Sequence, residues 1–146
     1  MSPRGADSHK KRLYLDTSAY LGLVLEEEGW ERVSAETEGA DLLSSVLLVL
    51  EARRSLIRLA REATLTSEKY QRCMERIEAD TGRFALRDLT LELCASNRVP
   101  AVATPRSLDL VHLRTALWFH ASEPLDRFVT ADVSQQAAAK ELGLPV

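Results

Sequence analysis

The chain has 146 residues, of which 45% are hydrophobic and 28% are charged, and its formal net charge is −3. These values are typical of a single soluble domain, and no apolar run approaches the roughly 18 residues that a membrane span requires. The N-terminus shows no secretory-signal pattern, and the two cysteines, Cys73 and Cys94, form neither a metal-binding spacing nor a disulfide framework. We therefore expect a cytoplasmic protein without a membrane anchor.

The charge is unevenly distributed along the chain. Residues 1–12 hold four basic residues and one acidic residue, which leaves a net charge of −6 on the remainder. Because residues 1–11 also contain Pro3 and Gly5 and show no apolar periodicity, we predict a disordered basic tail there. Residues 12–146 are predicted to form one domain. Its excess of acid at first argues against a nucleic-acid partner, so the positions of the acids become important.

Short apolar segments alternate with helical patterns after the predicted tail. The predicted strands span residues 12–16, 41–44, 83–86 and 127–130, and a last strand is expected to begin at residues 145–146. The predicted helices span residues 17–25, 30–38, 46–63, 66–80, 90–97, 107–120 and 133–142, with a loop at residues 99–106. This alternation is typical of an α/β fold with a parallel sheet.

Local patterns add expectations about helix ends and packing. Thr17 with Ser18, and likewise Ser107, are expected to cap the helices that follow them, and Thr66 is expected to open the 66–80 helix. We expect the leucines of the segment SVLLVLEARRSL to be largely buried, namely Leu47, Leu48, Leu50 and Leu56. The cysteines lie in apolar helical stripes, where we interpret them as buried filler.

Four acids lie at positions where they are not explained as ordinary solvent-exposed residues of a helix surface. Asp16 ends the first strand and Asp132 lies two residues past the 127–130 strand, and ligands of open α/β sheets bind beyond such strand ends. Glu51 lies among leucines, and Asp109 lies in the first turn of the 107–120 helix.

Each acid also has a purely structural interpretation. Asp109 could compensate a helix dipole, Asp132 could be a helix N-cap, and Glu51 could pair with a nearby arginine on its own helix, Arg54 or Arg58. Asp16 is the hardest to explain in this way. An acid directly after an apolar strand is costly unless water, a donor or a cation meets it.

The segments around these acids resemble a known family. LYLDTSAYL, SSVLLVLEARRSL, SLDLVHLRTAL and FVTADVSQQAAAKELGLPV resemble the four acidic blocks of PIN-domain ribonucleases, and more narrowly those of VapC-type toxins of bacterial toxin–antitoxin pairs. The resemblance implies a three-layer α/β/α sandwich with a short, mainly parallel central sheet. It places the acidic cluster of the family on Asp16, Glu51, Asp109 and Asp132, with supporting hydroxyls on Thr17, Ser18 and Thr130. One departure is that Val133 and Ser134 follow Asp132, where the family commonly has a basic residue and leucine.

The resemblance also implies an activity, the metal-dependent cleavage of single-stranded RNA. Crowded carboxylates repel a phosphate unless a hard divalent cation such as Mg²⁺ neutralises them, and Mn²⁺ suits the same oxygen ligands. Asp16 and Asp109 are then expected to be the principal metal ligands, and Asp132 a ligand of the same or a second ion. Glu51 would hold a water molecule or accept a proton. The three hydroxyl residues would orient carboxylates or substrate phosphate, or serve only as helix caps and strand-end hydrogen bonds.

Other residues near these acids allow two interpretations each. His112 lies one helical turn past Asp109. A histidine on an apolar helix face is more often a buried, hydrogen-bonded core residue than a metal ligand or a general base. Arg54, Arg58 and Arg61 form one helical stripe, which could guide RNA phosphates or could be a solvated face paired with Glu62.

The family resemblance further implies partners, namely a second copy of the chain in a homodimer and a small antitoxin protein. We expect either contact on the helix pair 46–63 and 66–80, through Leu47, Leu59, Tyr70 and Met74. The main alternative is a PIN-like module that only binds protein, with a weakened site around Asp132. A receiver domain fits poorly because the early acid pair is missing and Lys140 is deep in the last helix. An aspartate-nucleophile phosphatase requires a second aspartate where Ser18 stands.

Overall fold

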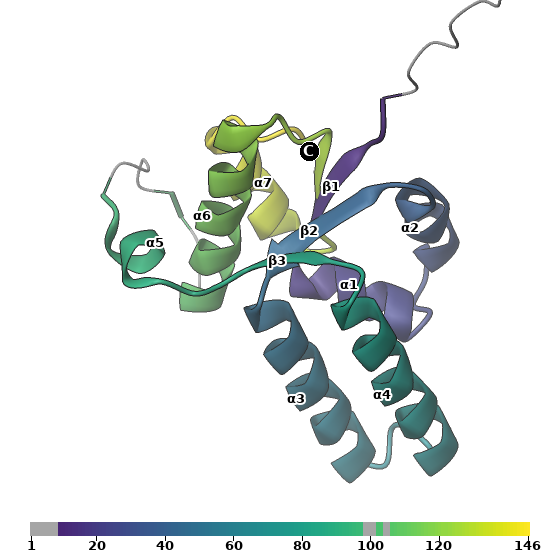
Figure 1. The fold of residues 1–146 in the computed structure, drawn as a ribbon. Helices are drawn as coiled ribbons and strands as arrows, with labels where there is room; N and C mark the ends of the chain where they lie inside the picture. The colour runs from purple at the N-terminus through teal and green to yellow at the C-terminus, as the bar shows by residue number, and fades with distance from the viewer. Residues whose placement is uncertain (1–8, 98–101, 104–105) are drawn as a thin grey trace, which may run out of the picture.

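The computed structural model describes residues 9–97, 102–103 and 106–146. Within these residues the strands are β1 (Arg12–Leu15), β2 (Asp41–Ser45), β3 (Ala85–Arg87) and β4 (Arg127–Val129). The helices are α1 (Thr17–Val24), α2 (Trp30–Thr37), α3 (Leu47–Arg61), α4 (Ser67–Thr81), α5 (Leu91–Ala95), α6 (Ser107–Ser122) and α7 (Val133–Glu141) (Figure 1). The predicted alternation of strands and helices is confirmed.

The four strands form one sheet in the order β3-β2-β1-β4, and every neighbouring pair is parallel. The central strand β1 is covered on both faces, which explains its continuous apolar sequence. Leu13 and Leu15 pack with residues of α1 and α2, whereas Tyr14 packs with residues of α6 and α7. The result is the expected three-layer α/β/α sandwich.

Helices α3 and α4 form a hairpin that extends away from the sheet (Figure 1). Its apolar core packs against α1 through Leu48, Ala52 and Leu56 of α3. These three positions recur every four residues and therefore lie on one face of the helix. Leu50 lies on the opposite face and is 66% exposed, so the expectation that it is buried is wrong.

Four further local expectations are wrong. Residues 145–146 form no strand, although the Pro145 carbonyl accepts a hydrogen bond of 2.7 Å from the Phe128 amide beside the sheet. Cys94 is exposed because the five-residue helix α5 buries only Leu93, whereas Cys73 is buried as expected. The cap of α1 is Asp16 rather than Thr17 or Ser18.

The cap of α6 also differs from the expected one. Arg106 holds the N-cap position there, without a side-chain cap hydrogen bond, so Ser107 is the first helical residue instead of the cap. Thr66, at the start of the predicted 66–80 helix, is the N-cap of α4, and its Oγ1 atom accepts a hydrogen bond of 3.1 Å from the Lys69 amide.

The predicted tail and the predicted loop lie partly outside the described residues. Residues 1–8, and most of the predicted loop at residues 99–106, are not described. Of the predicted tail, His9 contacts Asp126 at 3.0 Å and Lys10 pairs with Asp41 at 2.9 Å. None of the helices in the described ranges combines the length and the apolar character that a membrane span needs.

Candidate active site

The strand order places the ends of β1 and β4 at the point where the sheet reverses direction. From β1 the chain builds outward through β2 to β3, and β4 is then added on the other side of β1. Ligands of open α/β sheets bind at this reversal, outside the carboxyl ends of the strands. Asp16 directly follows β1, and its amide donates to the Val129 carbonyl of β4 at 3.1 Å. The candidate site therefore lies where the fold favours a ligand.

Asp16 is buried, with 4% of its surface exposed, and its carboxylate is held by uncharged donors. Oδ1 accepts hydrogen bonds from the Ala19 amide at 3.0 Å and from the Ser18 hydroxyl at 2.7 Å. Oδ2 accepts a hydrogen bond of 2.5 Å from the Thr130 hydroxyl. The burial is thus tolerated because donors meet both oxygens, while the negative charge itself stays uncompensated by these contacts.

Ser18 and Thr130 connect the two strand ends. Their hydroxyl oxygens lie 3.2 Å apart, and the Ala131 amide donates to Ser18 Oγ at 3.0 Å. The Asp132 amide donates to Thr130 Oγ1 at 3.1 Å. The two hydroxyls therefore fix both the Asp16 carboxylate and the loop that carries Asp132.

Asp109 and Asp132 add negative charge beside Asp16. Burial is the largest cause that raises the pKa of Asp109, and the charges of Asp132 and Asp16 raise it further, while Arg106 and His112 act in the opposite direction. The side chain of Asp132 is exposed and caps α7 by accepting from the Gln135 amide at 3.0 Å. Asp132 is therefore the N-cap of α7, as one interpretation predicted, and its charge also raises the pKa of Asp109.

Glu51 reaches the site from α3 and contacts α1 and α6. Its Oε1 atom accepts a hydrogen bond of 2.8 Å from the Thr17 hydroxyl and lies 3.0 Å from His112 Nε2. Burial tends to raise the pKa of Glu51, but the hydrogen bond and charge of His112 and the hydrogen bond of Thr17 lower it overall. The carboxylate is consequently held in its ionised form.

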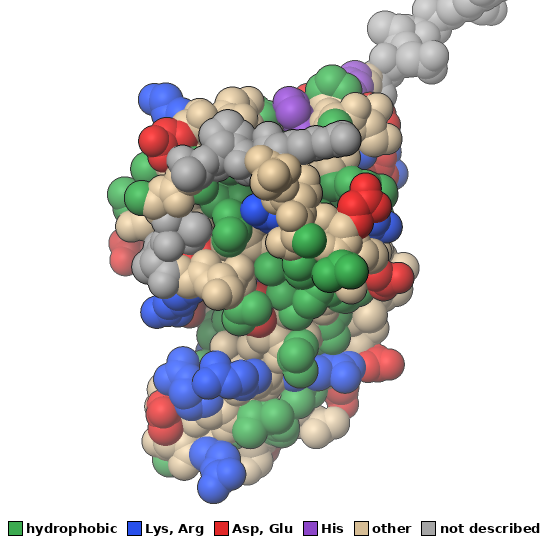
Figure 2. Space-filling view, turned by 90° about the vertical axis from the view of Figure 1, so that its left-hand side faces the viewer, with side chains coloured by type: hydrophobic (Ala, Val, Ile, Leu, Met, Phe, Trp, Pro, Cys, Tyr) green, Lys and Arg blue, Asp and Glu red, His purple; other side chains and the backbone are tan. Residues whose placement is uncertain are grey.

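The arginine pairing considered for Glu51 is not what the structure shows. Arg58 pairs with Glu62 at 3.4 Å, as the solvated-face interpretation expects. Arg54 and Arg61 are exposed on the same helix. Basic side chains gather over the α3–α4 hairpin at the lower part of the face in Figure 2, with apolar side chains above them.

The donor chemistry of the site suits a hard divalent cation. Asp16, Glu51, Asp109 and Asp132 offer carboxylate oxygens, and Ser18 and Thr130 offer hydroxyls, which are the ligand types of Mg²⁺ and Mn²⁺. Among the described residues, Asp16, Asp109 and Asp132 form no ion pair within 4.0 Å, although the charge of Arg106 acts on Asp109. In that same part of the chain, no three His, Cys, Asp or Glu side chains are arranged to hold an ion between them. The oxygen ligands are thus of the type that such an ion prefers, but the side chains do not converge on one position.

Two residues of the site were not found from the sequence. Gln135 is buried, and its Nε2 atom donates to the Asp109 carbonyl at 2.8 Å, which ties α7 to α6. Tyr14 donates to or accepts from His112 Nδ1 at 2.8 Å. The alternation of side chains along β1 does predict that Tyr14 lies on the face opposite Leu13 and Leu15. It does not predict which residue Tyr14 contacts there.

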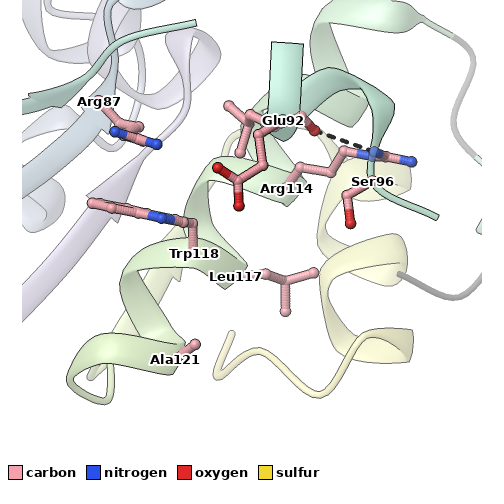
Figure 3. Close-up of a pocket in the computed structure, with 8 residues that line it drawn as sticks. Arg87, Glu92, Ser96, Arg114, Leu117, Trp118 and Ala121 are labelled. Carbon is pink, nitrogen blue, oxygen red and sulfur yellow. Dashed lines mark hydrogen bonds between the residues drawn. The ribbon is translucent and has the colours of Figure 1, made fainter. Parts of the chain in front are cut away.

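A separate pocket of about 250 Å³ lies between β3, α5 and α6. Figure 3 shows Arg87 beside Trp118, and the Arg87 guanidinium carbon lies 4.1 Å from the centre of the Trp118 ring. Arg114 donates to the Leu93 carbonyl at 3.2 Å. None of the predicted site residues lines this pocket, so it is distinct from the acidic site.

Fold and site together define an α/β protein with a cluster of acids at the carboxyl edge of a parallel sheet. No protein-family model matches the chain, and no curated protein matches its sequence. The residues of the site are therefore what indicates a function.

Proposed function

We propose that the protein is a metal-dependent endoribonuclease of the VapC type, which cleaves single-stranded RNA by attack of water on a phosphodiester. One observation carries the proposal. Asp16 is buried at the reversal point of the sheet, and among the described residues its carboxylate accepts hydrogen bonds from uncharged donors alone. Its charge acts on Asp109 together with that of Asp132. If Asp16 served only the stability of the fold, a basic side chain beside it would neutralise its charge and make the fold more stable.

In this proposal Asp16, Asp109 and Asp132 would hold Mg²⁺ or Mn²⁺. The cation would supply charge neutralisation for the phosphate and lower the pKa of water. Ser18 and Thr130 keep the Asp16 carboxylate oriented through the hydrogen bonds described above. Glu51, whose pKa is lowered, is ionised at neutral pH and is proposed to accept the proton of the attacking water.

The partners in this proposal are RNA, a small antitoxin protein and a second copy of the chain, in the cytoplasm. Of the surface residues expected on the helix pair, Tyr70 and Met74 are half-buried against the core of α1, α3 and α4. Leu50 of α3 and Trp118 of α6 are more available, being 66% and 44% exposed. The basic side chains Arg54, Arg58 and Arg61 are proposed to guide RNA phosphates.

A second candidate is a module of the same fold that only binds protein. The observation that favours it is the loop after β4, where Asp132 is exposed and engaged as a helix cap and Val133 is 81% exposed. In this case the acids would not act together on a substrate.

Incubation of the full chain with end-labelled single-stranded RNA and Mg²⁺ or Mn²⁺ distinguishes the two candidates. We expect endonucleolytic products with the wild type, and a loss of about 10³-fold or more in Asp16→Asn, since a principal charge is removed while the shape is kept. Asp41→Asn is the matched control, because Asp41 is an exposed aspartate on β2 outside the site. Absence of cleavage by the wild type, or equal cleavage by Asp16→Asn, would contradict the proposal.

A further inference from the structure

We infer that His112 is a positioning residue, which together with Tyr14 fixes the Glu51 carboxylate so that one of its oxygens stays available to the site. The catalytic consequence rests on the proposed ribonuclease function, whereas the positioning itself is a property of the fold. The sequence pattern alone favoured a satisfied core histidine at this position.

His112 joins α6 to α3 and to the β1–α1 segment, three regions that are far apart in the chain. It is 2% exposed on α6, and its two ring nitrogens contact different partners. Nδ1 lies 2.8 Å from the Tyr14 hydroxyl of β1, and Nε2 lies 3.0 Å from Glu51 Oε1 of α3 and 3.0 Å from the Thr17 hydroxyl of α1. The hairpin that carries Glu51 packs mainly on α1, so this contact links it to the opposite helix layer.

Hydrogen-bond accounting assigns the protons of this network. An ionised carboxylate only accepts, so Nε2 of His112 carries a proton and donates it toward Glu51. Nδ1 lies within hydrogen-bond distance of the hydroxyl of Tyr14, which is buried completely. The hydrogen-bonded chain runs from Tyr14 through His112 to Glu51.

The arrangement engages one oxygen of Glu51 and leaves the other. Thr17 and His112 both approach Oε1, while no hydrogen bond to Oε2 occurs within the described residues. The Glu51 side chain is 22% exposed, which leaves room for water beside it. A carboxylate fixed in this way is preoriented for proton transfer, and outer hydrogen bonds of this kind typically change activity by about 10- to 100-fold.

A purely structural histidine would behave differently from a positioning one. Its removal would lower stability without any dependence on Glu51. Positioning through Glu51 instead requires that the loss of His112 costs little once Glu51 has lost its charge. A side chain that restores only the donor toward Glu51 should also restore function. Gln places an amide nitrogen near the position of Nε2, whereas Leu fills the space without any donor.

The kinetic test compares single-turnover RNA cleavage by His112→Leu and His112→Gln, each in the wild-type and the Glu51→Gln background. We expect His112→Leu to lower the cleavage rate about 10- to 100-fold and His112→Gln to recover most of that loss. In Glu51→Gln, His112→Leu should change the remaining rate by less than about threefold. Equal losses in both backgrounds, or no difference between Leu and Gln, would overturn the inference while the proposed function stands.

A nuclear magnetic resonance measurement on the full wild-type chain tests the positioning without any substrate. We expect the His112 ring to carry its proton on Nε2, the Nε2 resonance to move in Glu51→Gln, and the Nδ1 resonance to move in Tyr14→Phe. A proton on Nδ1 alone, or a ring insensitive to Glu51→Gln, would overturn the inference. If the wild type does not cleave RNA, the proposed function and the catalytic consequence fail, and the ring resonances still decide whether His112 positions Glu51.

Discussion

Two buried aspartates in this molecule have opposite surroundings. Asp80 of α4 is 7% exposed and accepts a hydrogen bond of 2.8 Å from the Tyr20 hydroxyl. It also pairs with Arg76 at 3.3 Å and Arg83 at 3.5 Å. Asp16 is 4% exposed, and its hydrogen bonds within the described residues come from an amide and two hydroxyls. Both carboxylates have hydrogen-bond donors, but in the part of the chain that the structure describes only that of Asp80 has its charge compensated by close cations.

The comparison shows that burial of an acid does not by itself indicate a functional site. Asp80 links α4 to α1 through Tyr20, and the two arginines neutralise its charge. A structural role therefore explains its presence. Asp16 adds its charge to those of Asp109 and Asp132, which disfavours ionisation of Asp109. Acids that repel one another in this way are candidates for a ligand site.

The largest effect on stability is expected at the compensated acid. Asp80→Ala leaves the buried Tyr20 hydroxyl without its acceptor and removes both ion pairs, so we expect a loss of roughly 2–3 kcal/mol in the free energy of unfolding. Urea denaturation followed by circular dichroism measures this loss. RNA cleavage by the folded variant, assayed at low temperature, should match the wild type. A stable Asp80→Ala protein without activity would reverse the roles assigned to the two aspartates.

A smaller effect is expected when a single donor to Asp16 is removed. Thr130→Val keeps the shape of the side chain and loses the hydroxyl that connects Asp16 with the Asp132 amide. We expect a loss of about 1 kcal/mol in stability and about tenfold in cleavage rate, because the carboxylate becomes less well oriented. Thr130→Ser, which retains the hydroxyl, is the matched control and should stay within about threefold of the wild-type rate.

The smallest effect concerns the repulsion at Asp109. Its pKa is raised in the folded state, so its ionisation costs stability above that pKa, and the cost disappears below the unfolded value as both states become protonated. Asp109→Asn should therefore raise the melting temperature at pH 7 by about 1–2 °C in metal-free buffer, a modest value because solvent screens the partly exposed group. The difference should shrink as the pH falls toward 3. A lower melting temperature for Asp109→Asn at pH 7 would show that its charge stabilises the fold.

Most of the fold could be predicted from the sequence. Alternation of short apolar segments with helical periodicity identified every strand and helix of the described residues to within a few positions. The errors arose where packing direction matters. Leu50 looks buried in an apolar run, but only the direction in which the α3–α4 hairpin leaves the sheet determines which face of α3 is covered. Pro145 has strand-like neighbours, yet it makes one isolated hydrogen bond at the sheet edge.

The candidate site could be predicted as a set of residues but not as a set of contacts. Strand ends and helix starts located Asp16, Asp109 and Asp132, because topology brings these ends to one edge of the sheet. The partner of Glu51 could not be predicted, since its own helix offers arginines at favourable spacing. Only the three-dimensional meeting of α3 and α6 brings His112 to it.

Binding of Mn²⁺ tests most directly whether the uncompensated acids at the end of β1 form a cation site. Electron paramagnetic resonance of free Mn²⁺, titrated with the full chain, measures the bound fraction, and addition of Mg²⁺ measures competition. We predict that the wild type binds Mn²⁺, that Mg²⁺ displaces it, and that Asp16→Asn and Asp109→Asn weaken binding by about tenfold or more. Asp41→Asn, the control on β2, should bind as the wild type does. Undetectable binding by the wild type, or unchanged binding by Asp16→Asn, would contradict the account.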